Sequence, residues 1–292
     1  MKLVQEDRSN DSSSATKPDV VGYFEGKTQS ILSRYGPGPR VHYHTGLVDE
    51  PPPPGASILD LRRRLIAAQE RILWYAAEVW DAPSTFTGDV LDVGCGLGGG
   101  SIFWASEFGA QVTAVTCAPS HVDWVERFAA QAGVESQVRA QLCDALEVAG
   151  ENHFDAAVAF DSSGYLLRNE WFRRLGSLLR PGGRVFIIDC FLGRPEYEEA
   201  FNLYWRTRIG TIDEYMAAAR EAGLRSEVFD DISHRTEHFW TTTQALTKAE
   251  AQKGGLSNAE KLRYEGSHRV HALVRQGLND GGLLYALMSF SK

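Results

Sequence analysis

The chain has 292 residues, of which 43% are hydrophobic and 11% aromatic, and this content is enough for a packed core and excludes global disorder. The formal net charge is −8, so the chain lacks the Lys and Arg excess that nonspecific nucleic-acid binding requires. No apolar run approaches the length of a membrane span, and the N-terminus has no basic-then-apolar signal pattern. The four cysteines form no C-x-x-C pair, so we expect a reduced, cytoplasmic protein without a disulfide framework or a zinc site.

The first 80 residues are expected to form a polar tail followed by helical segments. Residues 1–18 are rich in Ser, Asp and Asn and predict a disordered tail. A short helix is expected from about Gly22 to Leu32, because the run Gly36-Pro37-Gly38-Pro39 breaks it. Four prolines at 51–54 predict a stiff spacer, and residues 58–79 carry apolar side chains at helical spacing.

Strands alternate with helices between residues 90 and 189. Short apolar runs predict the strands, and amphipathic stretches predict the helices. The expected strands are 90–93, 111–115, 137–142, 155–160 and 184–189, and the expected helices are 101–108, 121–132 and 170–179. This alternation predicts an α/β fold built on a mostly parallel, doubly wound Rossmann-like sheet with right-handed crossovers.

The last hundred residues differ in character from this core. Residues 191–210 are aromatic and mixed in charge, and after them we expect helices at 211–222 and 264–276 and strands at 227–232 and 283–289. The insertion after the fifth strand and residues 20–55 are expected to form a lid over the ligand-binding edge of the sheet. The predicted organisation is a tail at 1–18, an N-terminal helical and lid segment at 19–80, a ligand-binding core at 81–190, and a lid insertion with C-terminal strands that complete the sheet at 191–292.

The most specific motif is the run from Val90 to Gly100, V-L-D-V-G-C-G-L-G-G-G. Its glycines let the backbone turn tightly and approach a ligand, and Asp92 falls at the end of the strand, where open α/β sheets bind ligands. The spacing also fits G-x-G-x-x-G, but a dinucleotide site needs an acid at the end of the next strand. Residues 116–120, Thr-Cys-Ala-Pro-Ser, contain no acid, which disfavours a nicotinamide cofactor.

The D-V-G-C-G-L-G form resembles motif I of the S-adenosylmethionine-dependent methyltransferases. This resemblance implies a Rossmann-like methyltransferase fold, S-adenosylmethionine as cofactor and methyl transfer as activity. Asp92 would then place negative charge near the cationic part of the cofactor. Thr116 and Cys117 end the second strand, where the ribose is expected, and Asp144 could accept the adenine amino proton. Ordinary strand termination explains the first pair equally well, and a helix cap explains Asp144.

Residues Val112–Thr116, followed by His121, resemble one branch of this family, the cyclopropane-fatty-acid synthases, sterol methyltransferases and prenyl diphosphate C-methyltransferases. A threonine replaces the usual acid in that branch, and a glutamine commonly occupies the position of His121. The branch also implies cofactor contacts from Gln69 and from Tyr23, which would close over the methionine moiety. The expected cofactor-binding residues are Tyr23, Gln69, Asp92, Gly94, Cys95, Gly96, Thr116, Cys117, His121, Asp144, Ala145 and Phe160.

Over roughly residues 20–290 the chain resembles bacterial prenyl diphosphate C-methyltransferases of the geranyl diphosphate type. His42–Gly46 is similar to their His- and Tyr-rich segment, and Leu284–Met288 is similar to their final strand. The resemblance implies methylation of an alkene carbon, which leaves a carbocation that the site must shelter and deprotonate. Aromatic faces suit the cation, and the candidates are Phe160, Tyr204, Trp205, Phe239 and Trp240.

Asp161 is the expected catalytic base. It directly follows the fourth strand at the binding edge, and it falls where the geranyl enzymes carry a glutamate assigned to this role. A helix cap is the alternative for Asp161. Glu170 is the reserve candidate, although Asn169-Glu170 looks like a helix start.

A diphosphate requires cationic or hydrogen-bonding donors. The expected substrate-binding residues are Arg40, His42, Tyr43 and His44, together with Tyr204, Trp205, Phe239 and Trp240; Arg206 and Arg208 are further candidates. The resemblance implies a Mg²⁺ ion with the diphosphate, but the sequence does not locate its ligands.

We therefore predict an S-adenosylmethionine-dependent C-methyltransferase acting on an isoprenoid diphosphate. Prenyl chain length, the methylated carbon and a homo-oligomeric state are left open. The alternatives are methylation of another secondary metabolite at carbon, oxygen or nitrogen, and a cofactor-binding protein without catalysis.

Overall fold

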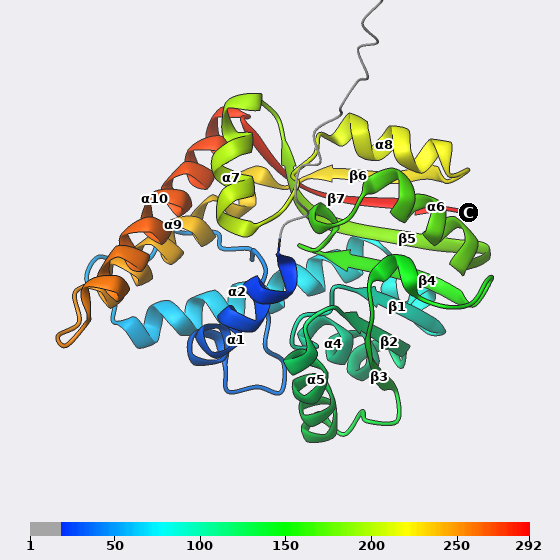
Figure 1. The fold of residues 1–292 in the computed structure, drawn as a ribbon, viewed down its shortest axis with the longest axis horizontal. Helices are drawn as coiled ribbons and strands as arrows, with labels where there is room; N and C mark the ends of the chain where they lie inside the picture. Colours follow the sequence, from blue (N-terminus) through cyan, green and yellow to red (C-terminus); the bar gives the residue numbers. More distant parts are fainter. Residues whose placement is uncertain (1–18) are drawn as a thin grey trace, which may run out of the picture.

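A central β-sheet organises the molecule in the computed structural model, which describes residues 19–292. Within this range the sheet has seven strands in the order β3-β2-β1-β4-β5-β7-β6 (Figure 1). The strands are β1 Asp89–Val93, β2 Gln111–Thr116, β3 Val138–Leu142, β4 Phe154–Phe160, β5 Leu179–Leu192, β6 Arg225–Asp231 and β7 Leu283–Ser291. The strands from β3 to β5 pair in parallel, and β7 runs antiparallel to both β5 and β6. The predicted mostly parallel, Rossmann-like α/β fold is confirmed.

Helices cover both faces of this sheet. One face packs against α2 Ile58–Val79, α4 Gly99–Phe108 and α5 Pro119–Ala132, and the other packs against α6 Arg168–Leu178 and α8 Ile212–Glu221. Successive strand residues therefore enter opposite cores: Val90 packs in the first and Leu91 in the second. Burial on both faces explains why the parallel strands are nearly continuous apolar runs.

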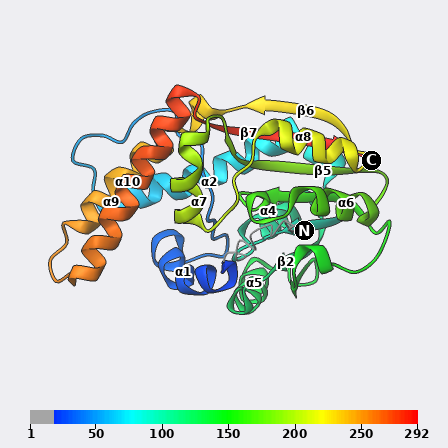
Figure 2. The same ribbon diagram turned by 45° about the horizontal axis from the view of Figure 1, so that its top comes forward.

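The remaining helices gather at one end of the sheet. They are α1 Val20–Tyr35, α7 Glu198–Trp205, α9 Ser233–Ala251 and α10 Asn258–Asp280, and the four-residue α3 Ala82–Thr85 precedes β1. In Figure 2, α9 and α10 run together away from the sheet, with α7 beside them. No helix within residues 19–292 has the length and apolar character needed to cross a bilayer.

Most predicted elements are present, but several differ. α1 is longer than expected and ends at Tyr35, β5 begins earlier, at Leu179, and the helices α3, α7 and α9 were not predicted. α9 was missed because its buried threonines favour strands. Inside the helix, however, Thr242, Thr243 and Thr247 donate to the carbonyls four residues earlier, at 2.7, 2.9 and 2.8 Å, which satisfies their hydroxyls. The predicted tail lies outside the described residues, and the proposed domain division stays a prediction.

Candidate active site

A cavity of about 500 Å³ opens where the parallel strands end. Its floor includes Gly94 after β1, Thr116 at the end of β2, Asp161 after β4 and Asp189 near the end of β5. Its walls come from α1, α7, α9 and α10. This is the edge at which open α/β sheets bind ligands, and the segments predicted to form a lid line the cavity.

The glycine loop lies against this cavity with its backbone exposed to it. Gly94 and Gly96 line the cavity and have φ values of 73° and 55°, in the left-handed region. A Cβ at Gly94 would lie 2.6 Å from the Cβ of Ser162, so a side chain there would clash. The loop is held in place because the N–H groups of Gly94 and Cys95 both donate to the carbonyl of Val115, each at 3.0 Å. Its backbone can therefore approach a ligand closely, although Cys95 itself does not line the cavity.

Asp92 lies beneath this loop and does not line the cavity. Its carboxylate accepts a hydrogen bond of 2.5 Å from the hydroxyl of Ser101, in the first turn of α4. Burial raises the pKa of Asp92 to about 6. The observed contact ties the end of β1 to the start of α4, so a direct contact between Asp92 and a ligand stays a prediction.

The ends of β2 and β3 complete the half of the cavity next to the loop. Thr116, Cys117, His121, Asp144 and Ala145 line it together. The Asp144 carboxylate accepts from the N–H of Leu146 at 3.0 Å, so it does cap a short helical turn as the alternative interpretation held. This half combines an open glycine backbone with hydroxyl, imidazole and carboxylate groups, and these groups fit an adenosine-containing cofactor.

The segment 42–45 reaches the cavity from the N-terminal region and is fixed by Gln69. The side-chain amide of Gln69 donates to the carbonyls of His44 and His42, at 2.8 and 3.3 Å. Gln69 is fully buried and does not line the cavity. The donors of Gln69 hold this segment, and the predicted contact between Gln69 and the cofactor stays a prediction. Tyr23, also predicted to contact the cofactor, is likewise not among the lining residues.

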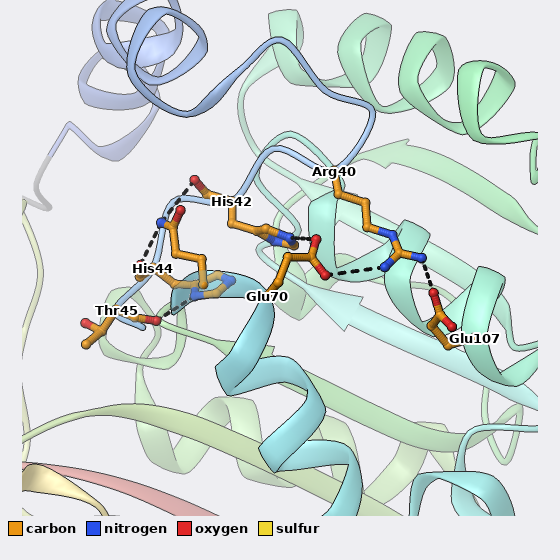
Figure 3. Close-up of polar contacts among 7 residues, drawn as sticks. Arg40, His42, His44, Thr45, Glu70 and Glu107 are labelled. Atoms are coloured by element: carbon orange, nitrogen blue, oxygen red, sulfur yellow. Dashed lines mark hydrogen bonds and ion pairs between the residues drawn. The ribbon is translucent and has the colours of Figure 1, made fainter. Parts of the chain in front are cut away.

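Arg40 points away from the cavity, contrary to the predicted role as a phosphate donor. Its guanidinium forms ion pairs with Glu70, at 3.3 Å, and with Glu107 (Figure 3). Glu70 also pairs with Nε2 of His42 at 2.9 Å. Because these two carboxylates neutralise Arg40, it is not available to a diphosphate in this arrangement.

His42, Tyr43 and His44 do line the cavity. Nδ1 of His44 lies 2.7 Å from the carbonyl of Thr45, so this nitrogen must carry the proton. Burial and the neighbouring His42 hold the pKa of His44 well below its usual range, so its Nε2 is an acceptor. Burial raises the pKa of Tyr43 well above its usual value, which keeps it a neutral hydroxyl.

Asp161 lines the cavity directly after β4 in a left-handed conformation, with φ 48°. The Tyr285 hydroxyl donates to one carboxylate oxygen and the Thr45 N–H to the other, both at 2.8 Å. Burial raises the pKa of Asp161 to about 7, and the negative charge of Asp189 also raises it. The carboxylate is bonded to these donors and does not cap a helix, so it is positioned to exchange a proton near neutral pH. The reserve candidate, Glu170, is exposed in the first turn of α6 and does not line the cavity.

Aromatic side chains form part of the wall of the cavity that Asp161 lines. Trp205 and Trp240 meet edge to face with ring centroids 5.9 Å apart, and the His44 ring lies 4.3 Å from the ring of Phe160. Five predicted aromatic residues line the cavity together, Phe160, Tyr204, Trp205, Phe239 and Trp240. These residues come from β4, α7 and α9, which are far apart in the sequence, and their predicted role toward a cation stays a prediction.

Sequence reasoning missed three polar groups around Asp161. Asp189 was recognisable as the end of the fifth predicted strand. Thr45 and Tyr285 lie in the two segments singled out by the resemblance, but nothing in the sequence linked them to Asp161, because these contacts join residues more than 100 positions apart.

A family model described as a methyltransferase domain matches residues 90–183. Residues 90–183 thus carry a methyltransferase domain, and the strand order is that of the class I S-adenosylmethionine-dependent methyltransferase fold. S-adenosylmethionine is thereby implied as its cofactor.

Several methyltransferases of known activity are similar to this chain in sequence. The geranyl diphosphate 2-C-methyltransferase of Streptomyces lasalocidi is 26% identical over 234 residues, which cover 76% of this chain and 78% of that protein. The probable tocopherol O-methyltransferase of rice is 32% identical over 149 residues, covering 50% of this chain, and this match spans only 40% of the rice protein. The 27-O-demethylrifamycin SV methyltransferase of Amycolatopsis mediterranei is 32% identical over 162 residues, covering 52% of this chain and 59% of that protein.

Solved structures agree on the fold. A geranyl diphosphate methyltransferase in complex with GPP and sinefungin has a TM-score of 0.77 at 20% identity, covering 94% of this chain and 97% of that chain. The [4+2]-cyclase SpnF has a TM-score of 0.74 at 22% identity, covering 95% and 96%.

Proposed function

We propose that this enzyme transfers the methyl group of S-adenosylmethionine to an alkene carbon of a prenyl diphosphate. The observation that carries the proposal is the position of Asp161, a carboxyl with a pKa near neutrality beside a wall of aromatic rings. The three matched geranyl diphosphate 2-C-methyltransferases, each spanning 76% of the chain, support the choice of acceptor.

The residues divide the work as follows. S-adenosylmethionine, when bound, supplies a methyl group on a sulfonium sulfur, and an alkene that accepts this group becomes a carbocation. The Gly94–Gly96 backbone, Thr116–Cys117, His121 and Asp144–Ala145 would hold the cofactor at the strand ends. Trp205 and Trp240 present ring faces and edges that exclude water, and an aromatic face stabilises a cation by about 0.5–2 kcal/mol.

Asp161 then takes the proton whose loss restores the double bond. Its ionised form is held by the Tyr285 hydroxyl and the Thr45 N–H, so the carboxylate is oriented before the cation forms. A general base in such a position contributes about 10²–10⁴-fold to the rate.

The proposal assigns no protein ligands to magnesium. One related structure was solved with Mg²⁺, geranyl diphosphate and S-adenosyl-L-homocysteine. Among residues 19–292, no group of three His, Cys, Asp or Glu side chains could hold a metal ion. We therefore assign no step to the metal, and the experiment below is run with and without it.

O-methylation is the second candidate. It is favoured by the tocopherol and rifamycin O-methyltransferases among the relatives, and the Asp161 carboxylate could equally take a proton from an acceptor hydroxyl. The two candidates differ in the acceptor atom, which the products reveal.

The test is incubation of the purified chain with trideuteromethyl-labelled S-adenosylmethionine and prenyl diphosphates of five, ten and fifteen carbons. Each is paired with its free alcohol, with and without MgCl₂, and products are identified by mass spectrometry and NMR. We expect a labelled methyl group on a carbon of one diphosphate and no turnover of its alcohol. Methyl transfer to oxygen, or no transfer to any diphosphate, would overturn the proposal.

A further inference from the structure

One face of α1 carries two basic side chains into the cavity. Phe24, Lys27, Ile31 and Arg34 all line it, at the three- and four-residue spacing that puts side chains on one helix face. Arg263, near the start of α10, lines the same cavity from the other side. Three cations from two helices therefore converge on a cavity in which the predicted cation, Arg40, is absent.

The carboxylates around these cations do not balance them. Both oxygens of buried Glu250 are occupied, one by Arg34 at 2.5 Å and the other by Arg62 at 2.7 Å, so one negative charge serves two guanidinium groups. Within residues 19–292, neither Lys27 nor Arg263 forms an ion pair with a carboxylate. Glu260, on the same helix as Arg263, interacts with it electrostatically, but even with this charge the cations at this end of the cavity outnumber the carboxylates.

The groups next to Lys27 are neutral. Its ammonium nitrogen lies 5.2 Å from the ring centroid of Tyr204 and 5.3 Å from that of Tyr23. The Tyr204 hydroxyl donates to Ser267 at 2.8 Å. Burial, with the charges of Arg34 and Lys27, lowers the pKa of His271 to about 3, so this imidazole adds no charge. Burial also lowers the pKa of Lys27, and so do the positive charges of Arg34 and Arg263. Mutual repulsion of this kind is relieved when an anion binds.

We propose that Lys27, Arg34 and Arg263 bind the anionic head group of the methyl acceptor, with the apolar part of that acceptor lying along the aromatic wall. The identity of the head group as a diphosphate rests on the proposed function; the anion site itself rests on the three side chains. Arginine and lysine differ in role here, because a guanidinium can bind two phosphate oxygens in a fixed geometry whereas an ammonium acts as a point charge.

The site is tested with inorganic pyrophosphate as the probe, using the full chain saturated with S-adenosylhomocysteine. Affinity is measured by isothermal titration calorimetry, with and without MgCl₂, for wild type, Lys27→Gln and Arg263→Gln. The matched control is Arg269→Gln, which removes an exposed arginine on the same helix that does not line the cavity. Loss of a charge-assisted contact is expected to weaken pyrophosphate binding about tenfold or more in each cavity variant. The control should stay within about twofold of wild type.

The outcomes separate this proposal from the proposed function. Pyrophosphate binding that depends on Lys27 and Arg263, without turnover of any prenyl diphosphate, would retain the anion site and reject the prenyl acceptor. Turnover of a prenyl diphosphate with an unchanged KM in both variants would retain the function and overturn the anion site. Absence of pyrophosphate binding to the wild type at millimolar concentration, with and without Mg²⁺, would also overturn it.

Discussion

Replacing Tyr285 by Phe should move the pH dependence of turnover to higher pH. The Tyr285 hydroxyl is buried and donates to Asp161 at 2.8 Å, and the substitution removes this donor without removing the ring. Only the ionised carboxylate gains from the donated hydrogen bond, so its loss raises the pKa of Asp161. The Thr45 N–H, on the other oxygen at 2.8 Å, remains.

The magnitude follows from the charge on the acceptor. A hydrogen bond to a charged group is worth about 1.5–3 kcal/mol, and one pKa unit corresponds to about 1.36 kcal/mol, so the shift is about 1–2 units. Because a base acts in its ionised form, wild-type turnover should rise with pH through about 7. In the Tyr285→Phe variant the rise should centre near about pH 8–9. Turnover at pH 7 should then be lower by roughly 5–50-fold, and the plateau at high pH should be near that of wild type.

The assay is kcat against pH from 6 to 10 with saturating cofactor and acceptor. Tyr215→Phe is the matched control, because this buried tyrosine bonds to Ser163 at 2.9 Å and not to Asp161. Its profile should coincide with that of wild type. Identical profiles for Tyr285→Phe and wild type, or a lower plateau without a shift, would refute the assignment of Asp161 as the titrating base.

Three further predictions concern the loop, the segment 42–45 and the aromatic wall. Gly94→Ala places a Cβ 2.6 Å from a neighbouring side chain, at φ 73°. The substitution should lower the free energy of unfolding in urea by about 2–4 kcal/mol. Gly96→Ala has open space at its Cβ and should lower it by only about 1 kcal/mol. Gln69→Leu leaves two buried carbonyls of segment 42–45 without a hydrogen-bond donor and should lower the free energy of unfolding by about 1–3 kcal/mol. An unchanged free energy of unfolding would mean that the amide does not hold the segment. Trp240→Leu should lower kcat about 2–30-fold by removing a ring that stabilises the cation, and an unchanged kcat would contradict that role.

Short sequence patterns predicted the glycine loop and the strands of the sheet, because these features depend on residues close together in the sequence. The D-V-G-C-G-L-G run defined the glycine loop, because only glycine adopts the positive φ values found at Gly94 and Gly96 at little cost. The alternation of apolar strands and helices defined the sheet, and counting along it placed Asp161 at the end of β4. Each inference used residues adjacent in sequence.

Partners far away in the sequence determine where several predicted site residues lie. Arg40 follows a Gly/Pro turn near the predicted site, but two glutamates, 30 and 67 residues away, bind it outside the cavity. Lys27 and Arg34 had no motif, and their importance appears only when α1 is seen to cover the cavity with that face. Contacts between residues so far apart in the sequence cannot be predicted from a short sequence pattern.

The central claim is that the glycine loop and Asp161 serve one reaction in one cavity. The most direct measurement is a crystal structure with S-adenosylhomocysteine and an unreactive prenyl diphosphate analogue. The account predicts the cofactor sulfur beside the Gly94–Gly96 loop and the Asp161 carboxylate next to the alkene, with Tyr285 still bonded to it. A cofactor bound elsewhere, or an alkene separated from Asp161 by another side chain, would contradict it.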